Sequence, residues 1–369
     1  MPSISNPDHT ARVRDPLGSN GRIVPGSAPD QTGISRTVST PTTDAAAPAK
    51  PAASGGGAKK PPPPLVPGTT SAERLALAQQ YGLRPLNVRP PLGEYIRDLT
   101  RRWAFIRVLA TSTAYAKNQN NYLGQLWAVL NPILNAAVYV LIFGILLNLS
   151  RGLDNSIAFI VIGVFMFRFV EASVTGGAKS ISGKTQLLRS LHFPRAVLPM
   201  STVLSLLTTL VPAIVVMCAI TLLSGLLPAY EMIHVTWWWL LLPAAVALMW
   251  VFNTGLAFIM ARFVAGTPDI ENVLPFIMRI MMYASGVIFP VVTYVERMQI
   301  PETSKAIVGG ILEYQPVAVY LYLVRSVLMQ EEMFPHSGLM WALGGAWAVL
   351  FFVIGFIVFW RGEERYGRD

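Results

Sequence analysis

Long apolar runs dominate the chain from about residue 123 to the carboxyl terminus. A membrane-spanning helix needs about 20 predominantly apolar residues, and six runs are long enough. They predict transmembrane helices near 126–149, 155–177, 196–225, 236–261, 272–293 and 339–360. Prolines inside or near the starts of these runs predict kinks at Pro132, Pro212, Pro243 and Pro275. The fold class that follows is an all-α membrane protein with six transmembrane helices.

Residues 92–120 carry a different pattern, in which apolar and charged side chains alternate at helical spacing. The apolar face consists of Leu92, Ile96, Leu99, Trp103, Ile106 and Ala110. The opposite face carries Glu94, Asp98, Arg97, Arg101 and Arg102. A helix that is charged on one face and bears a tryptophan on the other suits a membrane interface. We therefore expect an amphipathic interface helix; the alternative is a packed helix of a small soluble domain.

The first 91 residues hold 16 of the 28 prolines and many Ala and Gly residues. Such a composition cannot bury enough apolar surface to offset chain entropy, which predicts a disordered tail. A short helix at 71–81 is the one element expected within it. The tail has no apolar core of the kind found in secretory signals. The predicted organisation is thus a tail at 1–91, an interface helix at 92–120 and a membrane domain at 121–369.

Composition supports a membrane protein and not a nucleic-acid-binding one. The chain is 53% hydrophobic and only 13% charged, with a mean hydropathy of +0.47, whereas soluble domains carry about 25% charged residues. Of the net charge of +9, most lies before residue 122, where 15 Lys and Arg face 7 Asp and Glu. A basic region beside an apolar remainder favours an anionic membrane surface as partner.

The distribution of positive charge predicts the orientation in the membrane. If the amino terminus is cytoplasmic, segments on that side carry 13 Lys and Arg, against four on the other side. Positive residues concentrate in cytoplasmic loops, so both termini are expected in the cytoplasm of a multi-pass plasma membrane protein. The single cysteine, Cys218, forms no intrachain disulfide, and the four histidines are too scattered to predict a metal site.

The stretch GGAKSISGKTQLLRSLHFPR at 176–195 resembles a phosphate-binding loop, G-x-x-x-x-G-K-[ST]. The match is incomplete because Ala178 stands where the first glycine belongs, and no aspartate suited to hold magnesium follows an apolar strand. The stretch instead predicts a short, basic, amphipathic helix that ends before Phe193 and Pro194. Lys184 and Arg189 are expected on its exposed side. Composition leaves open whether it is a solvated loop helix or a docking element.

Several motifs in order resemble one family. The first span contains Leu-Gly-x-x-Trp-Ala-x-x-x-Pro, at Leu123, Gly124, Trp127, Ala128 and Pro132. A Phe-Pro-Arg-x-x-Leu-Pro element follows at Phe193, Pro194, Arg195, Leu198 and Pro199. ASGVIFP at 284–290 and the tail FWRGEERYGRD complete the pattern, although Gly286 stands where proline is more usual. Over 92–369 the chain resembles type-2 ABC exporter permeases for polysaccharide, O-antigen or teichoic acid, and its long tail is similar to that of actinobacterial galactan exporters.

The resemblance implies a permease that dimerises and pairs with two copies of a separate ATPase subunit. ATP and magnesium would be bound by that partner, and this chain would bind no cofactor. The connection between the second and third spans would dock on the ATPase, through Lys184, Leu187, Leu188, Arg189, His192, Phe193, Pro194 and Arg195. The interface helix, with Arg97, Arg101, Arg102 and Trp103, would lie beside it. Residues 294–336 would form short outer gate helices, and the substrate would be a lipid-linked glycan.

Charged residues inside spans are costly and need a partner or a pathway. Arg168 and Glu171 stand three residues apart in the second span, and Arg279 lies in the fifth. They are candidates to attract the diphosphate of a lipid-linked substrate; the alternatives are snorkelling and an internal ion pair. Phe289 and Tyr294 are candidates to stack on sugars, against the alternative of an ordinary interfacial aromatic belt.

Two other classes of function remain open from the residues alone. A membrane-embedded lipid or glycosyl transferase would need clustered carboxylates or a metal site near a membrane face. An ion-coupled secondary transporter would need acidic residues within the membrane and inverted repeats, for which Glu171 alone is thin support. A stable ATPase partner distinguishes the exporter from both.

Overall fold

The computed structural model describes residues 90–116, 122–147, 153–191, 193–228, 230–329 and 331–363, together with residues 73, 76, 77 and 80. By its contacts the chain divides into two units, Met1–Gly68 and Thr69–Asp369. Only the second contains described residues, so the predicted tail at 1–91 lies almost wholly outside them. The four described residues of the predicted short helix at 71–81 are helical.

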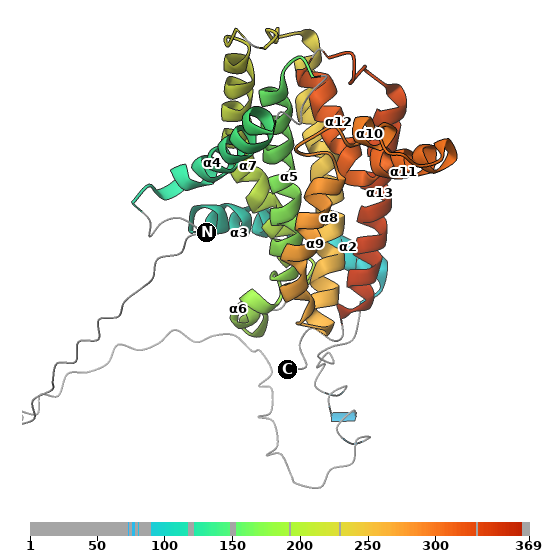
Figure 1. Cartoon of the computed structure of the whole chain (residues 1–369). Helices are drawn as coiled ribbons and strands as arrows, with labels where there is room; N and C mark the ends of the chain where they lie inside the picture. Colours follow the sequence, from blue (N-terminus) through green and yellow to red (C-terminus); the bar gives the residue numbers. More distant parts are fainter. Residues whose placement is uncertain are drawn as a thin grey trace, which may run out of the picture. The chain divides into compact units, whose positions relative to one another are not determined.

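Five helices are long and apolar enough to cross a membrane (Figure 1). Their ends lie within a few residues of five of the predicted spans. The largest difference is in the fourth span, which continues to Gly266. The described part of the chain contains helices and turns but no strand. The five are α4 (Trp127–Tyr139) continued by the π-helix η2 (Val140–Leu146), α5 (Ser156–Ala178), α7 (Val197–Ser224), η4 (Trp237–Leu241) with α8 (Leu242–Gly266), and α13 (Gly338–Arg361). The all-α membrane fold is thereby confirmed.

The predicted span at 272–293 is not one long helix. Helix α9 (Ile270–Ala284) has 15 residues, fewer than the about 20 that a span needs. The chain then turns at Gly286, whose φ of 67° is in the left-handed region that favours glycine. Helix α10 (Val291–Glu296) resumes after Pro290. The break therefore arises from Gly286, where the apolar pattern alone indicated continuity.

Two further helices follow the break and are joined by a sharp bend. They are α11 (Glu302–Tyr314) and α12 (Pro316–Leu328), bent by 71°, and together they are the further candidate for a span or a re-entrant loop. Pro316 accounts for the bend because it disfavours helix in the preceding residue, and Gln315 is extended at φ −61° and ψ 150°. Short helices expected within 294–336 are thus present.

Helix α5 occupies the centre of the bundle. Its apolar window is 78% buried, against 17–28% for the windows of Trp127–Leu146, α7 and α13. It packs against α4, α7, α8, α9 and α12. A helix that is apolar all round is stable where protein surrounds it, whereas its neighbours retain apolar faces suited to lipid or to another protein.

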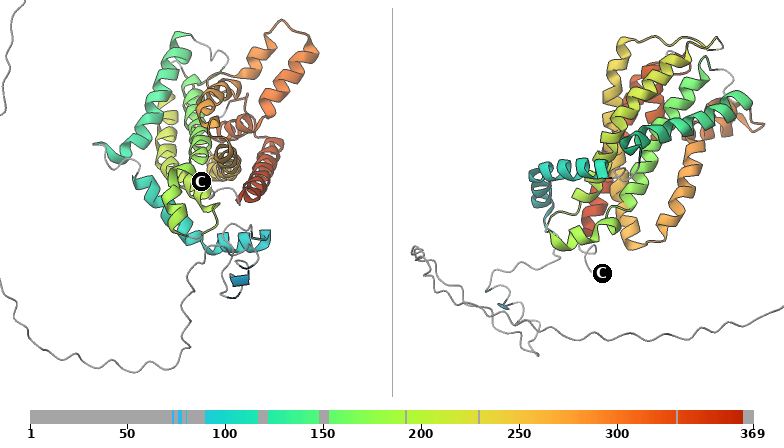
Figure 2. Two further views of the ribbon diagram at one scale, coloured as in Figure 1. Left: turned by 90° about the horizontal axis from the view of Figure 1, so that it is seen from below. Right: turned by 90° about the vertical axis from the view of Figure 1, so that its left-hand side faces the viewer.

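The interface segment is two helices, α2 (Leu92–Arg101) and α3 (Trp103–Ala116), separated at Arg102. Helix α3 packs on α7 and lies across the direction of the long helices (Figure 2). Its buried residues Ile106 and Ala110 agree with the predicted apolar face. Residues 117–120, the end of the predicted element, lie outside the described residues.

The predicted apolar face of α2 is partly wrong. Tyr95 and Leu99 are its buried residues, whereas Leu92 and Ile96, like Trp103 in α3, are exposed. The predicted pattern omitted Tyr95, which is buried because its hydroxyl finds partners in the protein. The exposed apolar residues, with exposed Arg97, Arg101 and Arg102, leave a second face that suits a membrane interface.

Helices α8 and α13 cross at two glycines. A methyl group on Gly355 would overlap the carbonyl oxygen of Gly255, and one on Gly255 would overlap the backbone of Phe351. Small residues allow such close approach of helix backbones in membranes. Overlap with backbone cannot be relieved by a change of rotamer, so this crossing depends on glycine.

We predict that Gly355→Ala lowers the unfolding free energy by roughly 1–3 kcal/mol, the usual cost of overpacking a core. Gly345→Ala in the same helix is the matched control, because nothing lies within 4 Å of its added methyl group. Both variants gain the same helix propensity. Thermal unfolding of the protein in nanodiscs measures the effect, and equal midpoints for the two variants would contradict the packing argument.

Candidate functional site

The connection between α5 and α7 (residues 179–196) contains the SGKT sequence. It forms a 3₁₀ turn, η3 (Ser182–Lys184), and a short helix, α6 (Thr185–Ser190). Leu191 is extended ahead of Phe193 and Pro194, which confirms the prediction of a short helix ending there. Because helix α5 rather than a strand precedes SGKT, the strand–loop–helix context of a phosphate loop is missing.

The α5–α7 connection is packed against the interface helices. Leu188 and Phe193 lie, with Phe105 and Leu109 of α3, against a cluster of buried apolar side chains. The rings of Phe105 and Phe193 meet edge to face at a centroid distance of 5.5 Å. Leu187 is half-buried and Pro194 is buried. The structure therefore joins two elements that the sequence only suggested were neighbours.

Part of the α5–α7 connection remains free to meet another molecule. The side chain of Leu191 is 50% exposed, at the end of the bundle where α6 projects (Figure 1). His192 and the side chain of Arg189 lie outside the described residues, so their predicted docking roles stay predictions.

The prediction of an exposed Lys184 is wrong for its ammonium group. The Nζ atom is buried and has no hydrogen-bond partner among the described residues. Burial lowers the pKa of Lys184 below its usual value because the charged form loses its hydration. The 3₁₀ turn that follows α5 places this side chain against the protein rather than toward solvent.

The partly buried carboxylate of Glu363 ties the α5–α7 connection to α2 and to the end of α13. Its Oε2 accepts a hydrogen bond from the Tyr95 hydroxyl at 2.9 Å, and its Oε1 accepts one from the Arg195 backbone N–H at 3.0 Å. The Ala196 N–H donates to the Tyr95 hydroxyl oxygen at 3.1 Å. We call Tyr95, Arg195, Ala196 and Glu363 the Glu363 junction.

The Glu363 junction joins α2, the start of α7 and the end of α13. Arg195 also donates from its guanidinium to the Glu363 backbone oxygen, and the Trp360 indole donates to the Pro90 oxygen at 3.1 Å. Burial raises the pKa of Glu363, and the hydrogen bonds from Arg195 and Tyr95 oppose that rise. Sequence reasoning identified Arg195 but missed its partners, since Tyr95 and Glu363 are 268 positions apart.

An ion pair links the same end of the bundle to α9. Lys179 Nζ lies 3.0 Å from Glu271 Oε1, joining the end of α5 to the first turn of α9. Both side chains are partly exposed, so the pair adds little stability. The pair instead fixes the position of α9 relative to the α5–α7 connection, so movement of the connection would displace α9.

The predicted charged residues within the membrane domain lie together. Arg168 Nη1 is 2.7 Å from Glu171 Oε2, and both side chains are partly exposed on α5. The charges of Arg168, Glu171 and Arg279 all act on Tyr139 of α4. We call Tyr139, Arg168, Glu171 and Arg279 the polar face of α4, α5 and α9. Arg279 lies on α9, which packs against α5, but it forms no ion pair with an acidic residue among the described residues.

The two candidate sugar-stacking aromatics contact each other. Phe289, in the break after α9, and Tyr294, in α10, meet edge to face at 5.3 Å between ring centroids. The Arg297 guanidinium lies 5.8 Å from the Tyr294 ring centroid. The structure thus brings the pair together without placing it on the polar face of α4, α5 and α9.

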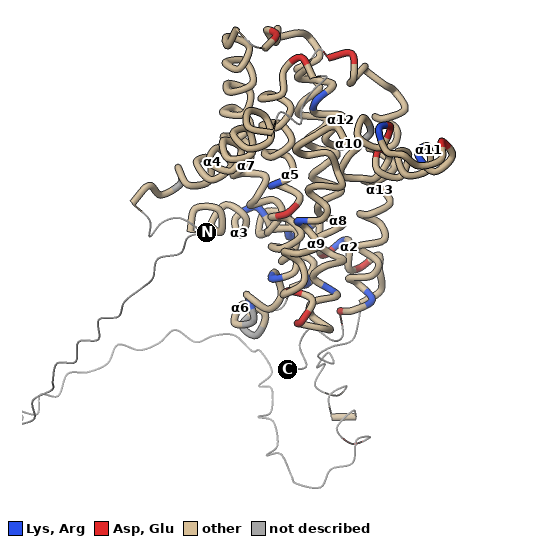
Figure 3. The backbone as a smooth tube through the Cα atoms, viewed as in Figure 1, with Lys and Arg blue, Asp and Glu red and all other residues tan. Residues whose placement is uncertain are grey.

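Acidic residues gather at the end of the bundle away from α6 (Figure 3). Asn155 caps α5 there by accepting from the Ala158 N–H at 3.0 Å, and its own backbone N–H donates to Glu331 Oε1 at 3.0 Å. Its side-chain amide donates to Ser224. Burial, with Asp154 and Glu231 nearby, raises the pKa of Glu331 to about 7. These bonds fix the α12–α13 linker to α5 and α7.

The chain is similar to bacterial export permeases. It is 26% identical over 269 residues to the O-antigen export system permease protein RfbA of Myxococcus xanthus, covering 73% of this chain and 96% of that protein. Two proteins of the same description from Klebsiella pneumoniae are 23% and 22% identical, each covering 70% of this chain and 92% of their own length. No protein-family model matches the chain. The similarity confirms the resemblance to permeases at the level of the family, and it is to transport subunits rather than to enzymes.

We predict that Tyr95→Phe loosens α2 from the bundle. The change leaves the buried Ala196 N–H without its acceptor and Glu363 without one of its two donors, at a cost of about 1–3 kcal/mol. Hydrogen–deuterium exchange of residues 91–102 should become faster. Tyr122→Phe, at a fully exposed tyrosine, is the control. Unchanged exchange in Tyr95→Phe would show that the Glu363 junction does not hold α2.

Proposed function

We propose that this chain is the membrane-spanning subunit of an ATP-driven exporter of polysaccharide. The observation that carries the proposal is the α5–α7 connection, which projects at one end of the bundle and is joined to three helices through the Glu363 junction. The similarity to O-antigen export permeases over almost their whole length supports the same function. This chain would supply the passage, and a separate subunit would bind and hydrolyse ATP with magnesium.

The ATPase would dock on the α5–α7 connection. Exposed Leu191 offers an apolar contact, and Leu188 and Phe193 pass any movement to α3 because they pack beside it. The same movement would displace α2 and α13 through the hydrogen bonds of Glu363, and α9 through the Lys179–Glu271 pair. A pull on this short segment would therefore move several helices together. We infer two ATPase copies and a second copy of this chain, as in a symmetric dimeric exporter.

The polar face of α4, α5 and α9 is the proposed substrate path. Arg168 and Arg279 place positive charge at membrane depth, where it attracts a diphosphate. Exposed apolar residues of α9, among them Phe276, Ile277 and Ile280, border it and suit a polyprenyl chain or the second copy. The substrate would be a polyprenyl-diphosphate-linked glycan, either galactan or an O-antigen-like chain.

The proposed location is the plasma membrane, with both termini in the cytoplasm. The excess of Lys and Arg on one side supports this orientation. In the described part of the chain, the α5–α7 connection and the end of α13 lie at the same end of the bundle (Figure 1). That end would then face the compartment that contains ATP.

The docking proposal predicts that Leu191→Asp abolishes copurification of an ATP-hydrolysing partner. A carboxylate at the centre of an apolar contact is strongly disfavoured because it loses its hydration. Leu227→Asp, at an exposed leucine just after α7 at the opposite end, is the matched control. Affinity purification followed by an ATPase assay measures the outcome. Retention of the partner by Leu191→Asp, or purification of a wild-type chain that transports without any ATPase, would overturn the proposal.

The path proposal predicts that Arg279→Leu lowers glycan export by about tenfold or more, the effect of losing one charge-assisted contact. Arg279→Lys keeps the charge and should restore a substantial part of export. Surface glycan is measured in cells, with copurification of the ATPase as the check on assembly. Normal export by Arg279→Leu would remove this residue from the path.

A further inference from the structure

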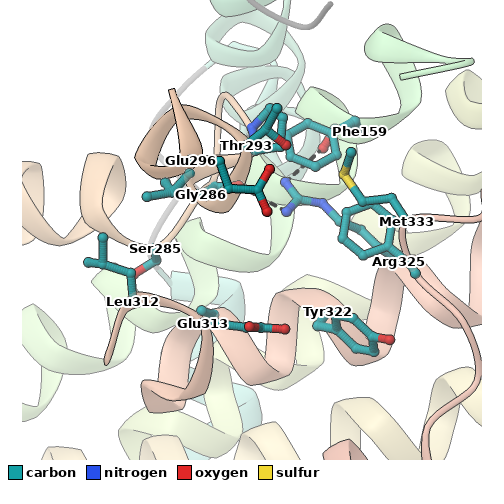
Figure 4. A pocket seen from close by; sticks show the side chains of 14 residues that line it. Phe159, Ser285, Gly286, Thr293, Glu296, Leu312, Glu313, Tyr322, Arg325 and Met333 are labelled. Carbon is teal, nitrogen blue, oxygen red and sulfur yellow. Dashed lines mark hydrogen bonds between the residues drawn. The ribbon is translucent and has the colours of Figure 1, made fainter. Parts of the chain in front are cut away.

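A cavity of about 350 Å³ lies among α5, the break after α9, α10, α11, α12 and the linker before α13 (Figure 4). Its volume falls within the about 300–1,000 Å³ typical of small-molecule sites. Carboxylates, hydroxyls, aromatic rings and one guanidinium line it together, among them Thr293, Glu296, Glu313, Tyr322, Arg325 and Phe334. None of these residues belongs to the polar face of α4, α5 and α9 or to the Glu363 junction.

Arg325 makes the wall of this cavity rigid. Its side chain is 3% exposed and donates to three backbone oxygens, those of Gly286 at 2.9 Å, Val287 at 2.9 Å and Phe159 at 3.1 Å. The guanidinium also lies 3.4 Å from the centroid of the Phe159 ring. No carboxylate among the described residues lies within ion-pair distance of it. The charge is therefore used to hold the break after α9 against α5.

Glycine permits this close arrangement. Gly286 adopts the left-handed conformation, and its carbonyl oxygen accepts a hydrogen bond from Arg325. A methyl group on Gly163 of α5 would overlap the Val287 oxygen. The backbone around the cavity is thus set by two glycines and one buried arginine, which favours a preformed site over a gap that closes.

The opposite wall offers unused hydrogen-bond acceptors. Glu296 of α10 and Glu313 of α11 have no hydrogen-bond or ion-pair partner among the described residues, and both side chains border the cavity (Figure 4). A carboxylate accepts several hydrogen bonds at once. The two come from helices that pack against each other, so one small ligand can reach both.

An aromatic group completes the site. The rings of Phe159 and Phe334 are stacked at 5.9 Å, and Tyr322 meets Phe334 edge to face at 5.5 Å. The Tyr322 hydroxyl donates to the Pro335 oxygen at 2.7 Å, which orients its ring. The cavity therefore presents apolar ring surface on one side and carboxylate oxygens on another.

We propose that this cavity binds one uncharged sugar unit. A sugar ring has apolar C–H groups that pack on aromatic surface and hydroxyls that donate to carboxylates. An anion is disfavoured because Glu296 and Glu313 repel it, and both terminal nitrogens of the Arg325 guanidinium already donate to backbone oxygens. A metal ion is disfavoured because the described residues contain no group of three His, Cys, Asp or Glu side chains able to hold one. The inference rests on the proposed function, of which it names one subsite for the exported glycan.

The test is ligand-observed saturation-transfer NMR on the full chain in nanodiscs, without an ATPase partner. The probes are the methyl glycosides of galactose, glucose and mannose, with glucuronate as the anionic comparison. We expect saturable binding of at least one neutral glycoside. Glu313→Gln and, independently, Glu296→Gln should weaken it about tenfold, since each loses one hydrogen bond to a charged group.

Glu302→Gln is the matched control, because Glu302 lies on α11 as Glu313 does but is outside the cavity and pairs with Lys305. Its binding should equal that of the wild type. Absence of binding by all three neutral glycosides overturns the proposal. Wild-type affinity in both cavity variants, or tighter binding of glucuronate than of the neutral glycosides, overturns it as well. The ATPase partner is absent from this measurement. Failure of the chain to copurify an ATPase would therefore contradict the proposed function without affecting the sugar-binding result.

Discussion

The carboxylate of Glu363 is the point on which the coupling arrangement depends. Burying a carboxylate is unfavourable unless its oxygens are hydrogen-bonded, and Glu363 obtains those bonds from the Tyr95 hydroxyl and the Arg195 backbone. The bonds join Tyr95 near the start of the described chain, Arg195 in its middle and Glu363 at its end. Such a partly buried, hydrogen-bonded group contributes little net stability but disfavours any arrangement in which one partner is displaced. Helix α2, the start of α7 and the end of α13 are therefore held in one relative position.

The two ends of the bundle are held by different means. At the end with the α5–α7 connection, movable segments are fixed by the Glu363 junction and by packing of Leu188 and Phe193 on α3. At the other end, Asn155 and Glu331 fix the linker to α13, and Arg325 fixes the break after α9. Between them runs α5, buried over most of its length. A displacement at the first end can reach the second through α5 and α13, because both helices pack continuously against α8 or α12.

Much of the membrane fold could be predicted from the sequence because helix burial in lipid needs long apolar runs, and five such runs became five helices. The short helix before Phe193 and Pro194 was also predictable, because proline acts on its immediate neighbours. The predictions that were wrong concern features that no local sequence pattern encodes. Gly286 broke the expected fifth span, although it had stood out as the one departure from the family motif. The burial of Lys184 depended on three-dimensional packing.

The candidate sites likewise include residues that the sequence could identify and residues that only the three-dimensional structure reveals. Arg168, Glu171 and Arg279 were identifiable because charge is rare within apolar runs, and all three lie within electrostatic range of Tyr139. Tyr95 and Glu363 gave no local signal, since a tyrosine in an amphipathic helix and a glutamate in a charged tail are ordinary. The cavity around Arg325 could not be foreseen either, because its walls come from four separate helices, the break after α9 and a linker.

The proposed function requires that α2 and the α5–α7 connection move as one body when the proposed ATPase partner hydrolyses ATP. Spin labels at exposed positions, Ile96→Cys in α2 and Ser182→Cys in the connection, would measure their separation in a Cys218→Ala background. Pulsed electron paramagnetic resonance on the complex with its ATPase compares the nucleotide-free, ATP-bound and hydrolysed states. We predict an unchanged 96–182 distance within one chain, while the 182–182 distance between two chains changes. A 96–182 distance that shifts with nucleotide would contradict it.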